Sequence, residues 1–110
     1  MTLQEQFDKM VNHLRKQGER SINDSDGCMY RGNNGLMCAV GCLIPDDIYT
    51  VDMEGQPADY VINKYYLDLD MTLCNNMQYV HDHYGPDKWE EFFEKVAKEL
   101  DLQLPPMTKV

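Results

Sequence analysis

The sequence predicts a mainly α-helical domain of the α+β class, with four to five helices around one core and a small β-hairpin after the first helix. Three observations lead to this prediction. Apolar residues recur at helical spacing in several segments. Residues that favour helix ends bracket those segments. One Asn-Gly pair lies between short apolar flanks, as in a hairpin turn.

The first helix is expected to begin just after Thr2 and to end at Gly18. Thr2 and Glu5 have the spacing of a capping box, in which each side chain accepts a hydrogen bond from an otherwise unpaired backbone N–H. Glycine favours the left-handed conformation that often follows the last helical turn. A single apolar stripe runs between these ends, formed by Leu3, Phe7, Met10, Val11 and Leu14.

Residues 19–27 are polar and have no apolar period, so they are expected to form a loop. Part of this run, 24–27, looks like a calcium-binding loop. Aligning Gly27 with the glycine of such a loop places Ile22 at the first ligand position and Asn33 at the last, where carboxylates are required. An EF-hand is therefore excluded, and an Asx-rich turn is expected instead.

A short β-hairpin is predicted next, with arms at 28–31 and 36–38. Asn34 and Gly35 supply two adjacent residues that tolerate positive φ. A two-stranded ribbon is only marginally stable alone, so it must pack on helices.

Further helical segments are expected after the hairpin. The run 38–44 reads as a short apolar helix or turn that stops before Pro45, and Pro45 suits a new helical start. The last helix should begin at Pro86. The apolar faces of the three later helices are Ala58, Val61, Ile62 and Tyr65; Leu73, Met77, Val80 and Tyr84, capped by Asp70 or Thr72; and Trp89, Phe92, Phe93, Val96 and Leu100. Residues 1–104 should form one domain and 105–110 a loose tail.

Negative charge is concentrated in the middle of the chain. The formal net charge of the 110 residues is −9, and segment 32–87 holds nine acidic residues against a single base, Lys64. Such a segment repels nucleic acid phosphates and favours a basic protein surface or a cation. Direct duplex binding is therefore not expected.

The sequence predicts neither membrane insertion nor export. No apolar run approaches the ~18 residues needed to cross a bilayer, and residues 1–16 mix charged with apolar types, unlike a secretory signal. A cytoplasmic protein is expected, and the cysteines of such a protein are usually buried thiols rather than disulfides. No cofactor is expected.

Cysteine chemistry gives two candidate sites. Cys38 lies where a strand is expected to meet a helix, and a histidine such as His81 follows it in the chain order of a papain-type nucleophile and base. Cys38, Cys42, Cys74 and His81 have spacings that could bring four zinc ligands together on two helices. Buried core thiols are the more common explanation for such cysteines, and a CxxC pair, which makes zinc motifs specific, is missing.

Arg20, Tyr30 and Arg31 form a candidate ligand site. Arginine forks beside a tyrosine can bind a phosphate or a nucleotide base. The alternative is that these arginines pair with acidic residues such as Asp24, Asp26 or Asp46 and hold the loops together.

The acidic middle is also a candidate partner surface. All seven tyrosines lie between Tyr30 and Tyr84, and tyrosine is enriched at protein interfaces. Tyr60, Tyr66 and Tyr79 fall off the apolar stripes, and some of them are expected to be exposed. The predicted contact residues are Asp46, Asp47, Asp52, Glu54, Tyr60 and Tyr66.

The stretch YRGNNGLMCAVGCLIPDDIY (30–49), together with HDHYGPDKWEEFFEKVAKEL (81–100), resembles a family of small uncharacterised proteins found in bacteriophage and bacterial genomes. The resemblance covers most of the chain, and it implies a context rather than an activity. Small acidic phage accessory proteins often act by binding: they block a host defence protein, mimic a nucleic acid surface or sequester a signalling nucleotide. The host cytoplasm would then be the compartment.

The leading hypothesis is a non-enzymatic acidic binding protein that inhibits a bacterial host defence or regulatory protein with a basic surface. A protein that sequesters a signalling nucleotide is the first alternative, and a cysteine hydrolase or zinc-binding protein is the second. The sequence leaves open whether the chain forms a homo-oligomer.

Overall fold

A computed structural model describes residues 1–23 and 27–107. The described chain is mainly helical, as the sequence predicts. It contains no β-strand, so the predicted hairpin is not seen. It has four α-helices, α1 (Leu3–Gln17), α2 (Ala58–Lys64), α3 (Met71–His83) and α4 (Pro86–Glu99), and three single 3-10 turns, η1 (Asn33–Gly35), η2 (Gly41–Leu43) and η3 (Val51–Met53). No helix in these residues combines the length and apolar character needed to cross a bilayer.

The ends of α1 are those the sequence predicts. The Thr2 hydroxyl accepts a hydrogen bond from the backbone N–H of Glu5, and the Glu5 carboxylate accepts one from the N–H of Thr2. Gly18 ends the helix in the left-handed conformation, with φ 71°, and its N–H donates to the carbonyl of Leu14. Local sequence therefore sets both ends of this helix.

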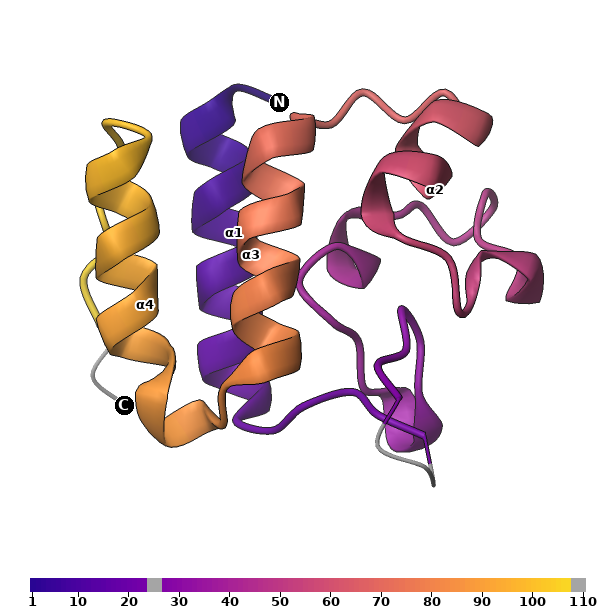
Figure 1. The fold of residues 1–110 in the computed structure, drawn as a ribbon, viewed down its shortest axis with the longest axis horizontal. Coiled ribbons are helices and arrows are strands. Elements are labelled where there is room, and N and C mark those ends of the chain that lie inside the picture. Colours follow the sequence, from indigo (N-terminus) through magenta and orange to yellow (C-terminus); the bar gives the residue numbers. More distant parts are fainter. Residues whose placement is uncertain (24–26, 108–110) are drawn as a thin grey trace.

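Helices α1, α3 and α4 stand side by side (Figure 1). The central member is α3, which contacts α1, α2 and α4. Asp70 caps its start by accepting from the N–H of Leu73, and Pro86 occupies the first turn of α4, both as predicted. We call α1, α3 and α4 the bundle.

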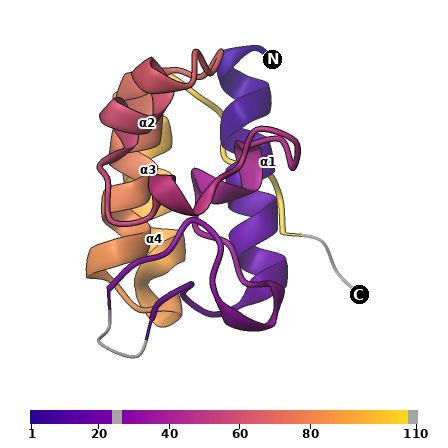
Figure 2. The same cartoon turned by 90° about the vertical axis from the view of Figure 1, so that its right-hand side faces the viewer.

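Residues 19–23 and 27–57, which we call the irregular segment, lie beside the bundle together with α2 (Figure 1) and face the viewer in Figure 2. Residues 38–44 contain one 3-10 turn, η2, in place of a helix. At Pro45 the chain makes a single turn, with the N–H groups of Ile48 and Tyr49 donating to the Pro45 carbonyl, and no helix starts there.

The predicted β-hairpin at 28–38 is wrong. Only isolated bridges form, between Ile22 and Cys28 and between Arg31 and Met37. The backbone groups that would extend a ladder are bonded to side chains instead. Glu54 accepts from the N–H groups of Tyr30 and Arg31, and the Gln17 amide bonds both the N–H and the carbonyl of Met37.

The core runs through the bundle and continues beneath the irregular segment. Its fully buried members include Phe7, Met10, Leu14, Leu73, Met77 and Phe93 of the bundle, and Cys38 and Val40 of the irregular segment. Burial of a large apolar side chain stabilises the fold by about 1.5–3 kcal/mol. One core therefore unites the two regions.

The chain beyond α4 returns along α1. The Arg15 guanidinium forms an ion pair with Glu90, and it also donates to the carbonyls of Pro105 and Pro106. The C-terminal segment is thus attached to α1 as far as Pro106. The predicted loose tail also includes residues 108–110, which lie outside the described residues.

Candidate functional site

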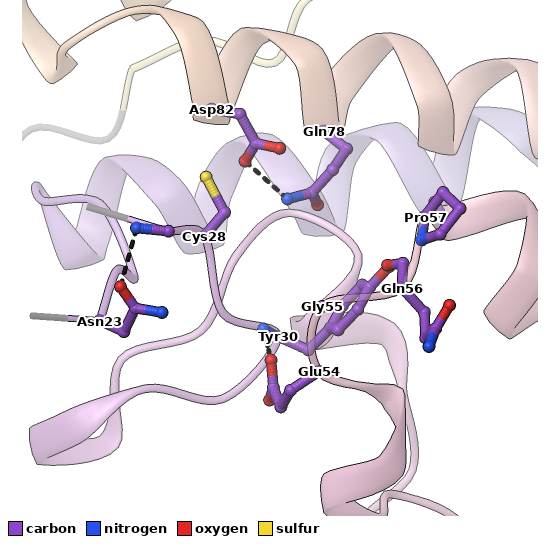
Figure 3. A pocket seen from close by; sticks show the side chains of 11 residues that line it. Asn23, Cys28, Tyr30, Glu54, Gly55, Gln56, Pro57, Gln78 and Asp82 are labelled. Carbon is purple, nitrogen blue, oxygen red and sulfur yellow. Dashed lines mark hydrogen bonds between the residues drawn. The ribbon is translucent and has the colours of Figure 1, made fainter. Parts of the chain in front are cut away.

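A pocket with a volume of about 480 Å³ lies between the irregular segment and α3 (Figure 3). Its lining comes from three places: Asn23, Gly27, Cys28 and Tyr30; Glu54, Gly55, Gln56, Pro57 and Ala58; and Gln78 and Asp82 of α3. The volume falls within the range of small-ligand sites. The lining combines polar side chains with a buried aromatic residue, Tyr30.

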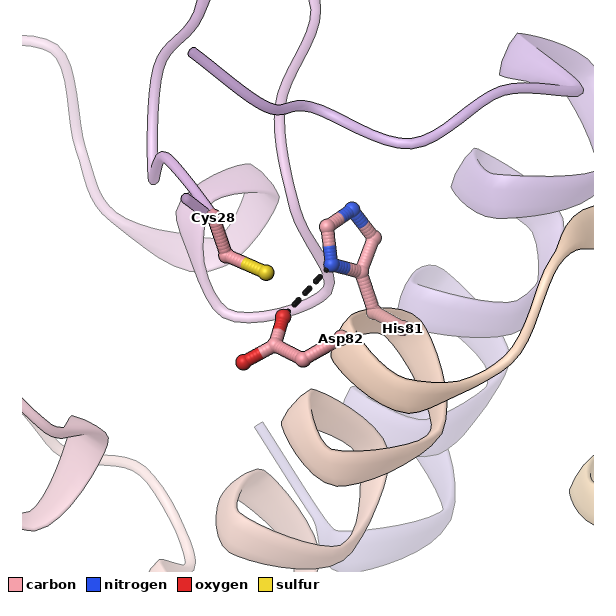
Figure 4. Close-up of side chains that lie close together, drawn as sticks. All are labelled: Cys28, His81 and Asp82. Atoms are coloured by element: carbon pink, nitrogen blue, oxygen red, sulfur yellow. Dashed lines mark hydrogen bonds and ion pairs between the residues drawn. The ribbon is translucent and has the colours of Figure 1, made fainter. Parts of the chain in front are cut away.

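A buried histidine lies behind the pocket. His81 has no exposed surface, and its Nε2 accepts a hydrogen bond from the N–H of Ser21 at 3.0 Å. That bond assigns the proton to Nδ1, which donates to Asp82 Oδ1 at 2.8 Å (Figure 4). The imidazole ring stacks on Trp89, at 5.9 Å between ring centroids. His81 thus joins α3 to the irregular segment and orients Asp82.

Gln78 holds the same carboxylate from one helical turn earlier. Its amide nitrogen donates to Asp82 Oδ1 at 2.8 Å, and its amide oxygen accepts from the N–H of Val40. Residues four apart lie on one face of a helix, so Gln78 and Asp82 meet the pocket together. The position of Asp82 is therefore fixed by two donors.

Cys28 brings a thiol to this group. One ligand atom each from Cys28, His81 and Asp82 lie within 4.8 Å of one another. Burial, and then the neighbouring Asp82 carboxylate, raise the pKa of the Cys28 thiol to about 12. A thiol with such a pKa stays protonated at neutral pH and is a weak nucleophile.

The group does not fit a metal centre. A metal on Nδ1 of His81 would require the ring proton on Nε2, where it would oppose the N–H that Ser21 directs at the same atom. The group does not fit a catalytic triad either. Both ring nitrogens of His81 are already bonded, so neither can accept the proton of Cys28.

A second polar centre lies at Glu54, on the opposite wall. Its two oxygens accept the N–H groups of Tyr30 and Arg31, at 2.8 and 3.0 Å, and Oε2 also accepts the hydroxyl of Tyr49. Burial and the Glu54 contact raise the pKa of Tyr49 to about 12. Glu54, predicted as a partner contact, is therefore engaged within the fold.

The predicted cysteine sites are not assembled. Cys38 is fully buried, its sulfur accepts the N–H of Gly41, and burial raises the pKa of its thiol. Cys42 and Cys74 do not join Cys38 and His81 in a group with metal-ligand spacing anywhere in the described chain. All four cysteines carry free thiols.

The predicted arginine–tyrosine site is also not assembled. Tyr30 lines the pocket, and its hydroxyl donates to the carbonyl of Gln56. Arg20 donates to the backbone carbonyl of Asp82. Arg31 donates to the carbonyl of Ile44, pairs with Asp46 and lies over the ring of Tyr49. Neither arginine lines the pocket. The other carboxylates suggested for these arginines, Asp24 and Asp26, lie outside the described residues.

The remaining predicted contacts are at the surface. Asp46, Asp47 and Asp52 are exposed. Tyr60 is 42% and Tyr66 94% exposed, as their positions off the apolar stripes predict. Val51, which the sequence did not single out, is 74% exposed. We call residues 46–70 the acidic segment.

Cys28, Gln78 and Asp82 are the site residues that sequence reasoning missed. The i, i+4 spacing of Gln78 and Asp82 could have predicted that these two side chains share one face of a helix. The approach of Cys28 could not have been predicted, because it depends on how the irregular segment packs against α3.

A scan against protein-family models found no match, and neither did searches of curated proteins and of solved structures.

Proposed function

We propose that this chain is a non-enzymatic binding protein whose acidic segment contacts a basic surface on a protein partner. The observation that supports the proposal is the exposure of Val51 and Tyr66 beside carboxylates that the fold does not neutralise. Aromatic side chains such as that of Tyr66 are enriched at the contact surfaces of proteins.

The charge of the acidic segment is largely uncompensated. Among its carboxylates, Asp46 pairs with Arg31, Asp70 caps α3 and Glu54 is bonded within the fold. Asp47, Asp52, Asp59 and Asp68 are exposed and form no ion pair with any residue the structure describes. Carboxylates in this state steer a basic partner during association.

The family resemblance of the sequence suggests the kind of partner, a bacterial defence or regulatory protein. No observation favours the alternative of a nucleotide-sequestering protein, because a phosphate in the pocket would face carboxylates. A hydrolase or zinc protein based on Cys38 is not favoured either, because its thiol is buried and protonated.

The test is capture of a partner from bacterial lysate by two variants with equal net charge. One carries Asp47→Lys, Asp52→Lys and Asp68→Lys in the acidic segment. The other carries Glu91→Lys, Glu94→Lys and Glu99→Lys, all exposed on α4. We expect the first variant to lose the captured protein and the second to retain it. Equal retention or equal loss by both variants would overturn the proposal.

A further inference from the structure

The pocket beneath α3 has the charge of a cation site. Two carboxylates line it, from Glu54 on one wall and Asp82 on the other, and none of the lysines or arginines of the described chain does. Arg31 points to the carbonyl of Ile44 and to Asp46, away from this lining. Arg20 donates to the backbone carbonyl of Asp82 in α3 and is not part of the lining.

Acidic residues act on the buried aromatic residue of the pocket. Burial raises the pKa of Tyr30, and the carboxylates of Asp82, Glu54 and Asp59 raise it further. These carboxylates would therefore stabilise a positive charge on a ligand that enters the pocket.

The walls of the pocket also suit the alkyl chain of a cationic ligand. Pro57 and Ala58 supply apolar surface, and Tyr30 supplies an aromatic residue that is only 5% exposed. A volume of about 480 Å³ is well above the ~30 Å³ share of one water molecule. A short alkyl chain with a polar head fits these dimensions.

Asp82 is held ready to receive that head group. Its Oδ1 accepts from both His81 and Gln78, so the carboxylate need not be ordered when a ligand arrives. A fixed acceptor costs less entropy on binding than a mobile one. Its conformation is set by the buried His81, which the fold holds through Ser21.

We infer that this pocket binds an alkyl ammonium or guanidinium group, with the Asp82 carboxylate as its counter-ion. The group comes either from a free diamine or guanidine compound or from a basic side chain of a protein partner. Only the second source rests on the proposed function, because the pocket and the acidic segment share residues 54–58. The charge requirement is the same for both.

The first test uses two probes of matched shape, n-butylguanidinium and its neutral analogue n-butylurea. Each is titrated into the whole chain while backbone and side-chain amide resonances are followed by NMR. We expect n-butylguanidinium to shift Gly27, Gly55 and the Gln78 side-chain amide saturably, with weaker binding at high salt. No saturable shift, or an equal response to n-butylurea, would overturn the inference.

The second test removes the charge and keeps the shape. Asp82→Asn retains an oxygen that can accept from His81 and Gln78, so the pocket should stay intact. We expect n-butylguanidinium to bind about tenfold more weakly or worse, since a charged hydrogen bond is lost. Glu99→Gln, which removes an exposed carboxylate on α4, should bind as the unmodified chain does. Equal binding by Asp82→Asn would contradict the role of Asp82.

The third test distinguishes the two sources. Agmatine represents a free compound, and N-acetyl-Ala-Arg-Ala-amide represents a protein side chain. Tighter binding of agmatine assigns the site to a free amine, and tighter binding of the peptide assigns it to a partner. If the acidic-segment variant and the α4 variant captured the partner equally while n-butylguanidinium still bound, the proposed function alone would be rejected.

Discussion

The bundle and the irregular segment are built by different interactions. In the bundle, apolar stripes pack against one another and each helix satisfies its own backbone groups. In the irregular segment, side chains bond many of the backbone groups: Gln17, Gln78 and His81 from the bundle, and Glu54 from the segment itself. The comparison shows why the pocket lies where it does. It forms at the boundary, where polar side chains must replace a missing sheet ladder.

The largest effect should come from Gly41→Ala, which tests the close approach inside the irregular segment. A Cβ at Gly41 would lie 2.0 Å from the carbonyl oxygen of Tyr30 and 2.8 Å from its carbon, both backbone atoms. We expect a loss on the order of 3 kcal/mol in the free energy of unfolding, measured by urea denaturation. The control is Gly18→Ala, where φ is 71° and nothing lies within 4 Å of the added atom. It should cost only about 1 kcal/mol. Equal losses would mean that η2 can move away from Tyr30.

The next effect should come from Glu54→Ala. The substitution leaves the N–H groups of Tyr30 and Arg31 and the hydroxyl of Tyr49 without their acceptor. We expect a loss of about 2–3 kcal/mol in the free energy of unfolding, because unsatisfied part-buried donors are costly. Glu54→Gln should lose less, since it keeps one acceptor oxygen. Glu91→Ala, exposed on α4, should change stability by less than about 0.5 kcal/mol. If Glu54→Ala left the free energy of unfolding unchanged, water would be taking the place of the carboxylate.

These two predictions fall in the region that the sequence described least well. The helices could be predicted because Thr2, Gly18, Asp70 and Pro86 act within one turn of their own position. The hairpin prediction failed although Asn34 and Gly35 do adopt positive φ, 60° and 76°. The turn residues behave as expected, yet side chains distant in sequence form hydrogen bonds with the backbone groups of the arms.

The same reasoning explains the outcome for the site. His81 could be named from sequence as a side chain with possible chemistry, but its burial against Ser21 depends on a contact between residues 60 positions apart in the chain. Exposure of Tyr60 was predictable, since a helical stripe determines which side of α2 faces water, whereas Tyr66 is exposed beyond the end of that helix. Pocket formation was not, because its walls come from three separate segments.

A smaller effect is expected at the start of the bundle. Thr2→Ala removes the hydroxyl that accepts from the N–H of Glu5, in a capping box that is exposed to water. We expect a loss of about 1 kcal/mol in the free energy of unfolding. Thr2→Ser keeps the acceptor and should be nearly neutral. If Thr2→Ala cost as much as Glu54→Ala, local capping would matter as much as the long-range bonds, and the contrast between the two regions would weaken.

The smallest effect is chemical, and it concerns Cys28 at the boundary between the two regions. Its thiol pKa is raised from 9.0 to about 12, first by burial and then by Asp82. At pH 8 the thiolate fraction is therefore about a thousandfold below that of an ordinary cysteine, and iodoacetamide should react slowly with the native chain. Asp82→Asn removes the carboxylate, so the pKa should fall and alkylation at Cys28, located by peptide mass spectrometry, should become faster. Cys74 serves as the internal control because it is buried in α3 with its own pKa raised to about 12, first by burial and then by Asp70. Acceleration at both cysteines would indicate that Asp82→Asn opens the fold, whereas acceleration at Cys28 alone would locate the negative field of Asp82 in the pocket.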